Sequence, residues 1–209
     1  MERDGVRAPE IVILPRRFYE RSTIAVARDL LGKVLVHGPV AGIIVETEAY
    51  LGGDDLASHS AVGITNRTRV IFGPGGHAYV YLSYGMHDCL NIVAQPEGKP
   101  GCVLIRALEP VEGIDVMRGR RLKSRSERDL ASGPGKLTQA MAITRAHSGA
   151  DMTRGDLIVR TPRIAISFEI AVTPRIGITK CADLPLRFLI RGNRFVSGRQ
   201  TELSSHRSR

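Results

Sequence analysis

The spacing of apolar and polar residues divides the chain into short strands and a few helices. Residues 78–83 alternate, with apolar side chains on one face and Tyr79 and Tyr81 on the other, which is typical of a strand. Between Ser22, a favourable helix N-cap, and Gly32, apolar residues recur at helical spacing and predict a helix. The same criteria predict strands at residues 33–37, 43–50, 89–94, 102–108, 157–160, 164–170, 175–178 and 186–191, and helices at residues 112–121 and 136–143.

Strands and helices follow one another in mixed order along the whole chain. This order indicates a single α+β domain, with a mainly antiparallel sheet and flanking helices. We place the domain at residues 13–198, between an N-terminal tail at residues 1–12 and a polar C-terminal tail at residues 199–209.

Two features interrupt the regular pattern. Residues 51–77 are rich in Gly, Asp, Ser, Thr and Asn, and a loop of this length in a compact domain is often functional. The strands at residues 78–83 and 89–94 predict a hairpin whose tip holds Tyr84 and Met86.

Charge and apolar content narrow the class of protein. The 30 basic and 21 acidic residues give a formal charge of +9, which favours a polyanionic partner. There is no apolar run of about 18 residues and no apolar signal segment at the N-terminus, so we expect a cytoplasmic protein without a membrane span. Six basic residues fall close together, at Arg118, Arg120, Arg121, Lys123, Arg125 and Arg128. This basic cluster is either a phosphate-facing strip or a solvated loop.

The cysteines and histidines do not form a metal-binding pattern. The chain has three cysteines, Cys89, Cys102 and Cys181, and no two of them form a Cys-x-x-Cys motif. This odd number and spacing argue against a disulfide framework and a structural zinc site. His59, within the polar loop, has no partner at metal-ligand spacing. We therefore expect no metal and no other cofactor.

Residues 45–50, Val-Glu-Thr-Glu-Ala-Tyr, carry the clearest candidate chemistry. Strand periodicity places Glu46, Glu48 and Tyr50 on one face. On this segment alone, an exposed charged face is the simpler interpretation, and a general base beside a stacking aromatic is the alternative. A glycoside hydrolase with paired carboxylates is a third, less favoured interpretation, because the chain has no Trp and few aromatic residues to bind sugars.

Taken together, several ordered segments resemble one family, the alkyladenine or 3-methyladenine DNA glycosylases. The resemblance covers about residues 13–198. It is carried by residues 18–33, by Val-Glu-Thr-Glu-Ala-Tyr at 45–50 with Ser-His-Ser at 58–60, by Tyr-Val-Tyr-Leu-Ser-Tyr-Gly-Met at 79–86 with Asn-Ile at 91–92, by Val-Leu-Ile-Arg-Ala-Leu-Glu-Pro at 103–110, and by Gly-Pro-Gly-Lys-Leu at 133–137.

The resemblance implies a role for each matched residue in catalysis and base binding. Glu48 corresponds to the family's water-activating carboxylate, and Arg106 to a residue that positions the flipped nucleotide and the water. Tyr50, His59 and Tyr81 correspond to residues that sandwich the flipped base. Asn91 corresponds to the residue whose side chain crowds the 2-amino group of normal guanine. Glu46 then becomes a structural neighbour rather than half of a carboxylate pair.

The resemblance also implies DNA contacts. Tyr84 corresponds to the side chain that fills the gap left by the flipped base, and the hairpin that carries it would insert into DNA. Met86 and His87 lie on the same hairpin, close to the DNA backbone. Arg67 belongs to an element that contacts phosphates, but this chain has Thr-Asn-Arg-Thr at residues 65–68 where the family usually has Thr-Pro-Arg-Asn.

The function that follows from the resemblance is monofunctional base excision. A monomeric glycosylase would bind double-stranded DNA, flip out damaged purines such as 3-methyladenine, 7-methylguanine, hypoxanthine or ethenoadenine, and leave an abasic site. Lys136 is an alternative Schiff-base nucleophile, but the matched motif gives it no such role. In a bacterium, the enzyme would associate with the nucleoid. The main alternative is a noncatalytic damaged-DNA-binding module on the same scaffold.

Overall fold

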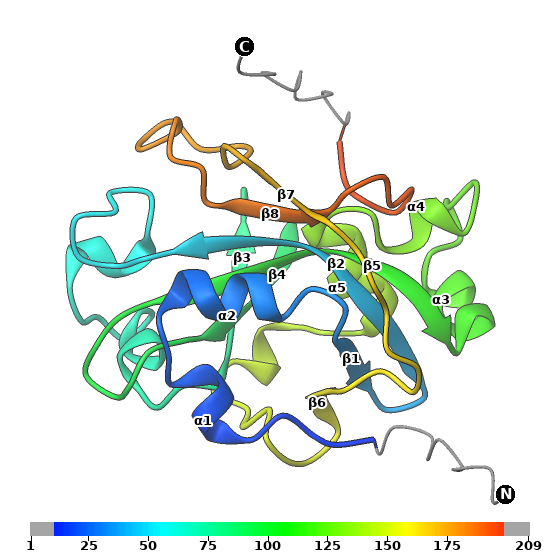
Figure 1. Cartoon of the computed structure of the whole chain (residues 1–209), viewed down its shortest axis with the longest axis horizontal. Helices are drawn as coiled ribbons and strands as arrows, with labels where there is room; N and C mark the ends of the chain where they lie inside the picture. The colour runs from blue at the N-terminus through cyan, green and yellow to red at the C-terminus, as the bar shows by residue number, and fades with distance from the viewer. Residues whose placement is uncertain (1–10, 199–209) are drawn as a thin grey trace, which may run out of the picture.

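The computed structural model describes residues 11–198, so residues 1–10 and 199–209 of the two predicted tails lie outside the described residues. Figure 1 shows one domain built on a curled sheet. Its helices are α1 (Arg16–Tyr19), α2 (Thr23–Asp29), α3 (Ile114–Arg120), α4 (Arg128–Ala131) and α5 (Pro134–Met141), with short 3₁₀ turns η1 (His59–Val62), η2 (Arg69–Phe72) and η3 (Arg145–His147). Its strands are β1 (Val34–His37), β2 (Val40–Tyr50), β3 (Ala78–Ser83), β4 (His87–Val93), β5 (Cys102–Glu112), β6 (Leu157–Arg160), β7 (Ile170–Thr173) and β8 (Arg187–Ile190).

All strand pairs in the described sheet are antiparallel, and the main path runs β3-β4-β5-β2-β1-β6. Strand β8 pairs with β2 and carries β7 on its other edge. Long antiparallel strands twist, and here the sheet curls into a half-barrel (Figure 1). The predicted α+β class is confirmed.

Strand β2 lies at the centre of the sheet and positions the candidate carboxylates. From Ala41 to Tyr50 one edge pairs with β5, with two bulges near Glu46, while the other edge pairs first with β1 and then, at Glu46 to Glu48, with β8. The strand is therefore paired along both edges, and both carboxylate side chains are 0% exposed. The interpretation of this segment as an exposed charged face is wrong, because groups from distant segments, among them Arg106, Arg187 and Ile176, enclose the two carboxylates.

Helix α2 packs on the sheet as its apolar spacing predicts. The Ser22 hydroxyl accepts a hydrogen bond from the Ala25 N–H, and Val26 and Ala27 are fully buried. The Thr47 hydroxyl of β2 donates to the Ala27 carbonyl over 2.8 Å, which ties the helix to the central strand. Figure 1 shows α2 in front of the long strands. None of the helices in residues 11–198 has the length and apolar content to cross a membrane.

Several predicted elements differ from those of the structure. The helix predicted at residues 112–121 begins only at Ile114, because β5 continues to Glu112 and Gly113 turns the chain with a left-handed φ of 67°. The predicted strands at residues 164–170 and 175–178 are replaced by β7, which ends immediately before Pro174. Residues 175–178 form a loop instead, and this loop contributes to the candidate site.

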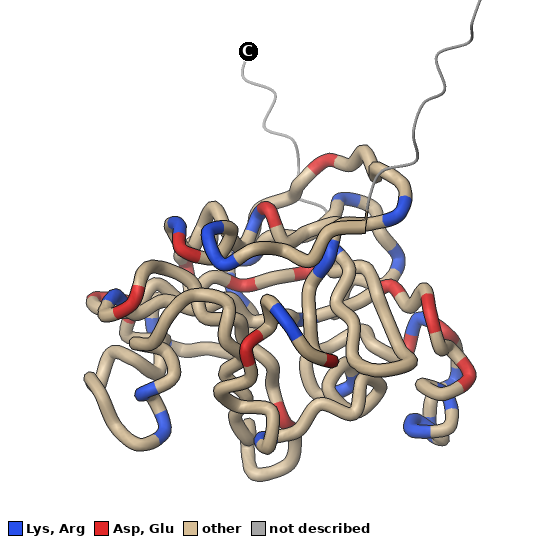
Figure 2. Tube along the Cα trace, turned by 90° about the horizontal axis from the view of Figure 1, so that it is seen from below, with Lys and Arg blue, Asp and Glu red and all other residues tan. Residues whose placement is uncertain are grey.

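The basic cluster at residues 118–128 is partly bound to the protein itself. Arg118 forms ion pairs with Asp115 and Glu127, and Arg120 donates a hydrogen bond to the Ala140 carbonyl. Figure 2 shows acidic and basic positions side by side in several surface segments. Lys123, Arg125 and Arg128 are exposed, so only part of this cluster is available to a phosphate backbone.

Candidate active site

A cavity of about 530 Å³ opens between the β3–β4 hairpin, the η1 turn and the 175–178 loop. This volume lies in the range of small-molecule sites, which is roughly 300–1,000 Å³. The structure brings most of the predicted site residues to this cavity. Those that line it are Tyr50, His59, Arg67, Tyr81, Tyr84, Asn91 and Arg106.

Aromatic rings form one wall of the cavity. The alternation of β3 places Tyr79 and Tyr81 on the same face, with ring centroids 5.7 Å apart in a stacked arrangement. The ring of His59, from η1, meets Tyr81 edge-on with centroids 4.5 Å apart. Such a wall offers flat, weakly polar surface to a planar ligand. Tyr79 was not predicted as a site residue, although the alternation of this strand already groups it with Tyr81.

His59 is held as a neutral ring. Burial and the nearby charge of Arg67 lower the pKa of His59 to about 4. A guanidinium only donates hydrogen bonds, so the 3.4 Å contact from Arg67 Nη2 makes His59 Nε2 an acceptor. The proton of the neutral ring is then on Nδ1, which donates to the Tyr79 hydroxyl over 2.9 Å. The wall is thus rigidly oriented without adding a charged histidine to the cavity.

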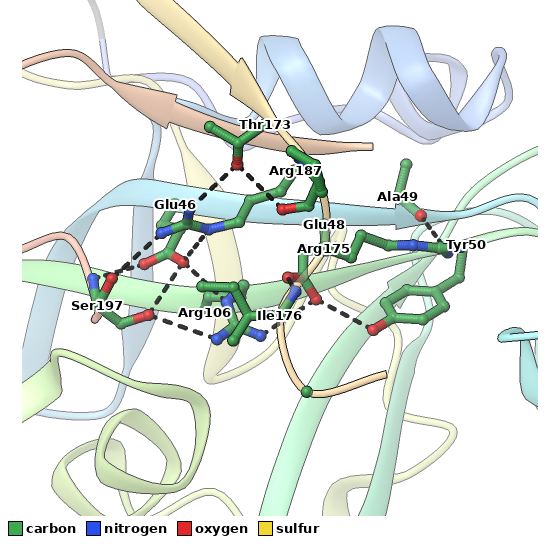
Figure 3. A network of polar contacts seen from close by, with 12 residues as sticks. Glu46, Glu48, Ala49, Tyr50, Arg106, Thr173, Arg175, Ile176, Arg187 and Ser197 are labelled. Carbon is green, nitrogen blue, oxygen red and sulfur yellow. Dashed lines mark hydrogen bonds and ion pairs between the residues drawn. The ribbon is translucent and has the colours of Figure 1, made fainter. Parts of the chain in front are cut away.

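Glu48 lies behind the cavity floor, and three of its direct partners line the cavity. Its Oε1 accepts a hydrogen bond from the Ile176 N–H over 2.8 Å. Its Oε2 accepts from the Tyr50 hydroxyl over 3.0 Å and from Arg106 Nη1 over 3.1 Å (Figure 3). The carboxylate is therefore fixed in position while having no exposed surface of its own.

The environment of Glu48 favours proton uptake. Burial raises the pKa of Glu48, because a desolvated carboxylate is costly, and the negative charge of Glu46 adds to this effect. The charge of Arg106 and the hydrogen bonds from Ile176 and Tyr50 act in the opposite direction but do not cancel it. A carboxylate with a raised pKa is suited to accept a proton near neutral pH.

Arg106 links Glu48 to Glu46 in a buried network (Figure 3). Its Nε donates to Glu46 Oε1 over 2.8 Å while its Nη1 reaches Glu48. Glu46 also accepts from Arg187 Nε over 2.7 Å and from the Ser197 N–H over 2.6 Å. Arg187 and Ser197 were not predicted, because no local motif marks them and they join the site only through tertiary pairing.

A second buried ion pair supports the opposite side of the site. Arg175 binds both oxygens of Asp55, over 2.6 and 2.8 Å, and donates to the Ala49 carbonyl over 3.0 Å. Its guanidinium carbon lies 4.6 Å from the centroid of the Tyr50 ring. Because Ile176 follows directly in the chain, this pair also fixes the N–H that holds Glu48. Neither residue of the pair was predicted as a site residue, because no local motif joins them.

Asn91 extends from β4 toward the cavity and is itself fixed. Its Nδ2 donates to the Tyr79 carbonyl over 3.3 Å, and its Oδ1 accepts from the Cys102 thiol over 3.8 Å. The side chain is nearly fully buried. A fixed amide at this position restricts the shape of any ligand that enters the cavity.

The β3–β4 hairpin places its tip beside the cavity mouth. Tyr84 and Gly85 both have positive φ, and Tyr84 is 82% exposed. The Tyr84 hydroxyl donates to the Gly177 carbonyl over 3.4 Å. Met86, 71% exposed, and His87 do not line the cavity. Gly135 approaches His87 so closely that a Cβ there would lie 2.8 Å from the His87 Cβ, so α5 supports the hairpin base.

Lys136 lies outside the cavity. Its amino group forms an ion pair with Asp129, and it lines a separate cavity that also contains Arg125 and Arg128. Within residues 11–198, no cluster of three His, Cys, Asp or Glu side chains is arranged to hold a metal ion.

Comparison with known proteins places the chain in a family. Residues 17–194 match the family model described as Methylpurine-DNA glycosylase (MPG). Relatives named "Putative 3-methyladenine DNA glycosylase" occur in Methanoculleus marisnigri, with 54% identity over 89% of this chain and 99% of the relative, and in Koribacter versatilis, with 48% identity over 91% and 96%. A third, in Methanocella arvoryzae, has 52% identity over 84% of this chain and 89% of the relative.

These matches, over nearly the whole chain, identify a DNA N-glycosylase, an enzyme of DNA repair. The chain belongs to the methylpurine-DNA glycosylase family.

Proposed function

We propose that this enzyme flips a damaged purine out of duplex DNA and hydrolyses its N-glycosidic bond with a water activated by Glu48. The observation that carries this proposal is the placement of Glu48. It is a buried carboxylate with a raised pKa, and its partners Tyr50, Arg106 and Ile176 form part of the cavity surface.

The proposed reaction is a displacement at the sugar C1′. The water oxygen forms a bond to C1′ while the bond from C1′ to the purine nitrogen breaks, and the water proton passes to Glu48. The purine leaves with the electron pair of the broken bond and, if neutral, takes up a proton from solvent or from a protein group. Positive charge that develops on the sugar is stabilised by the nearby carboxylate.

The cavity supports base selection. Tyr50, His59 and Tyr81 present rings that would sandwich a flipped purine, and Asn91 would crowd the 2-amino group of normal guanine. We propose 3-methyladenine, 7-methylguanine, hypoxanthine and ethenoadenine as the substrate class. Unstacking requires a few kcal/mol, roughly, and less for a damaged base, so aromatic stacking in the cavity offsets part of that cost.

The hairpin supports DNA engagement. Tyr84 is exposed at a tip beside the cavity mouth, where it would occupy the gap left by a flipped base. Met86 and His87, on the same hairpin, would contact the DNA backbone, and the exposed Arg67 would contact a phosphate. The contact between Tyr84 and Gly177 would break on binding. We propose that one protein molecule acts alone on each lesion.

Base release from defined duplexes tests the proposal. The expected products are the free damaged purine and an intact strand with an abasic site, because Lys136 lies outside the cavity. Glu48→Gln should bind the lesion but lose release. A wild-type protein that binds these duplexes yet releases no purine would support the noncatalytic lesion-binding module and contradict the proposal.

A further inference from the structure

The buried network behind the cavity contains more charge than the proposed chemistry requires. Four ionic side chains alternate in sign, in the order Arg187, Glu46, Arg106 and Glu48. All are nearly or fully removed from solvent. Buried charges are costly unless fully paired, and the Glu46–Arg187 half of the network does not touch the cavity. The catalytic proposal leaves this half without a role.

We propose that Glu46 is a positioning residue for hydrolysis: it fixes the orientation of Arg106 against Glu48 and takes up part of the Arg106 charge. This inference rests on the proposed function, because it assigns how the Glu48 base is held and tuned. Glu46 itself is separated from the cavity by Arg106.

The strand register explains why Arg106 lies between the two carboxylates. Glu46 pairs with Ala107 and Thr47 pairs with Ile105, so Arg106 is an extra residue in a β-bulge of β5. A bulge redirects the side chain of the extra residue. Here it allows Nε to bind Glu46 over 2.8 Å and Nη1 to bind Glu48 over 3.1 Å, so the guanidinium bridges two acceptors on one strand face.

Glu46 is itself fixed from a part of the chain beyond the family match. The match ends at residue 194, and Ser197 supplies both its N–H to Glu46 Oε2 over 2.6 Å and its hydroxyl to Oε1 over 3.0 Å. Arg187 Nε completes the shell over 2.7 Å. With these donors in place, Glu46 cannot rotate away from Arg106 without leaving buried donors unsatisfied.

The charge balance around Glu48 gives this arrangement a measurable consequence. The charged groups that face Glu48 are Glu46 on its own strand, Arg106 on β5 and Arg175 on the loop after β7. Tyr50 is a further titratable neighbour. Arg175 is paired with Asp55. Removing the Glu46 charge would leave Arg106 to stabilise ionised Glu48 alone, so the pKa of Glu48 should fall.

The pH dependence of single-turnover base release tests this role. The variant is Glu46→Gln, and the substrate is a duplex that contains hypoxanthine. Glu109→Gln on β5 is the control, because Glu109 binds Asn193 rather than a member of the buried network. In Glu46→Gln, the acid limb of the rate profile should move to lower pH by about one to two units, because residues 46 and 48 lie roughly 7 Å apart along the strand. Its plateau rate should fall at least about tenfold.

A charge-conserving variant separates orientation from charge and protects the test against misfolding. Glu46→Asp keeps the anion but shortens its reach, so its acid limb should stay near that of the wild type while its plateau rate falls. An unshifted acid limb in folded Glu46→Gln, or a wild-type plateau in Glu46→Asp, would overturn the proposal. If Glu48→Gln released base as fast as the wild type, the proposed function would itself be wrong, and the role of Glu46 with it.

Discussion

The Asp55–Arg175 ion pair offers a quantitative test of how the site is supported. Both side chains are essentially buried, 2% and 0% exposed, and the guanidinium binds both carboxylate oxygens. Asp55→Asn removes the negative charge and leaves the Arg175 cation in the interior. Breaking a buried pair in this way costs about 3–5 kcal/mol of unfolding free energy. For a chain of this size, the melting temperature should fall by roughly 6–20 °C.

A matched surface substitution provides the control. Asp29→Asn makes the same chemical change in a pair with Arg21 whose side chains are 52% and 38% exposed. Exposed pairs contribute about 0–1 kcal/mol, so this variant should unfold almost as the wild type does. Urea unfolding of the three proteins at neutral pH gives the comparison. Equal losses of unfolding free energy in Asp55→Asn and Asp29→Asn would refute the reasoning.

The pH dependence of stability gives an independent check. Burial alone would raise the pKa of Asp55, but the hydrogen bonds and charge of Arg175 outweigh it, and the pKa is lowered. The stabilisation is therefore fully present above the pKa of an unfolded aspartate and is lost as pH falls through the lowered folded pKa. The stability difference between the wild type and Asp55→Asn should narrow over that acidic range. A constant difference would mean that ionised Asp55 does not carry the effect.

Three further outcomes follow from the site. Tyr84→Ala, at an exposed hairpin tip, should leave the unfolding free energy within about 0.5 kcal/mol of the wild type. Its affinity for a lesion-containing duplex, measured by fluorescence anisotropy, should fall at least about fivefold, and unchanged affinity would contradict the wedge role. Asn91→Ser should increase release of guanine from undamaged DNA relative to hypoxanthine release, and an unchanged ratio would argue against steric exclusion by Asn91. Lys136→Met should release hypoxanthine at the wild-type rate, and borohydride should trap no covalent DNA complex with either protein; a trapped complex that disappears in the variant would identify Lys136 as a nucleophile.

The local pattern of the chain was sufficient for most of the framework. The alternation of residues 78–83 predicted β3 and the shared face of Tyr79 and Tyr81, and Ser22 with Gly32 bracketed α2. Strand periodicity also placed Glu46 and Glu48 on one face. These features depend on contacts within a few residues, which the sequence records directly.

The burial of the carboxylates depends on contacts between distant segments, so it could not be predicted from the residues around each carboxylate. Glu46 is covered by Arg187 and Ser197, 141 and 151 residues further along the chain. Arg175 likewise lies in a segment that resembles a short strand but binds Asp55, 120 residues earlier. A single arginine in such a segment carries no signal of its distant partner, so the electrostatics of the site could be determined only from the fold.

The central claim is that Glu48 activates the water that cleaves the glycosidic bond. Single-turnover release of hypoxanthine by Glu48→Gln, compared with the wild type and Glu109→Gln under excess enzyme, tests it most directly. We predict that Glu48→Gln binds the duplex but releases the base at least about 100-fold more slowly, while Glu109→Gln retains the wild-type rate. Release by Glu48→Gln at the wild-type rate would contradict the claim.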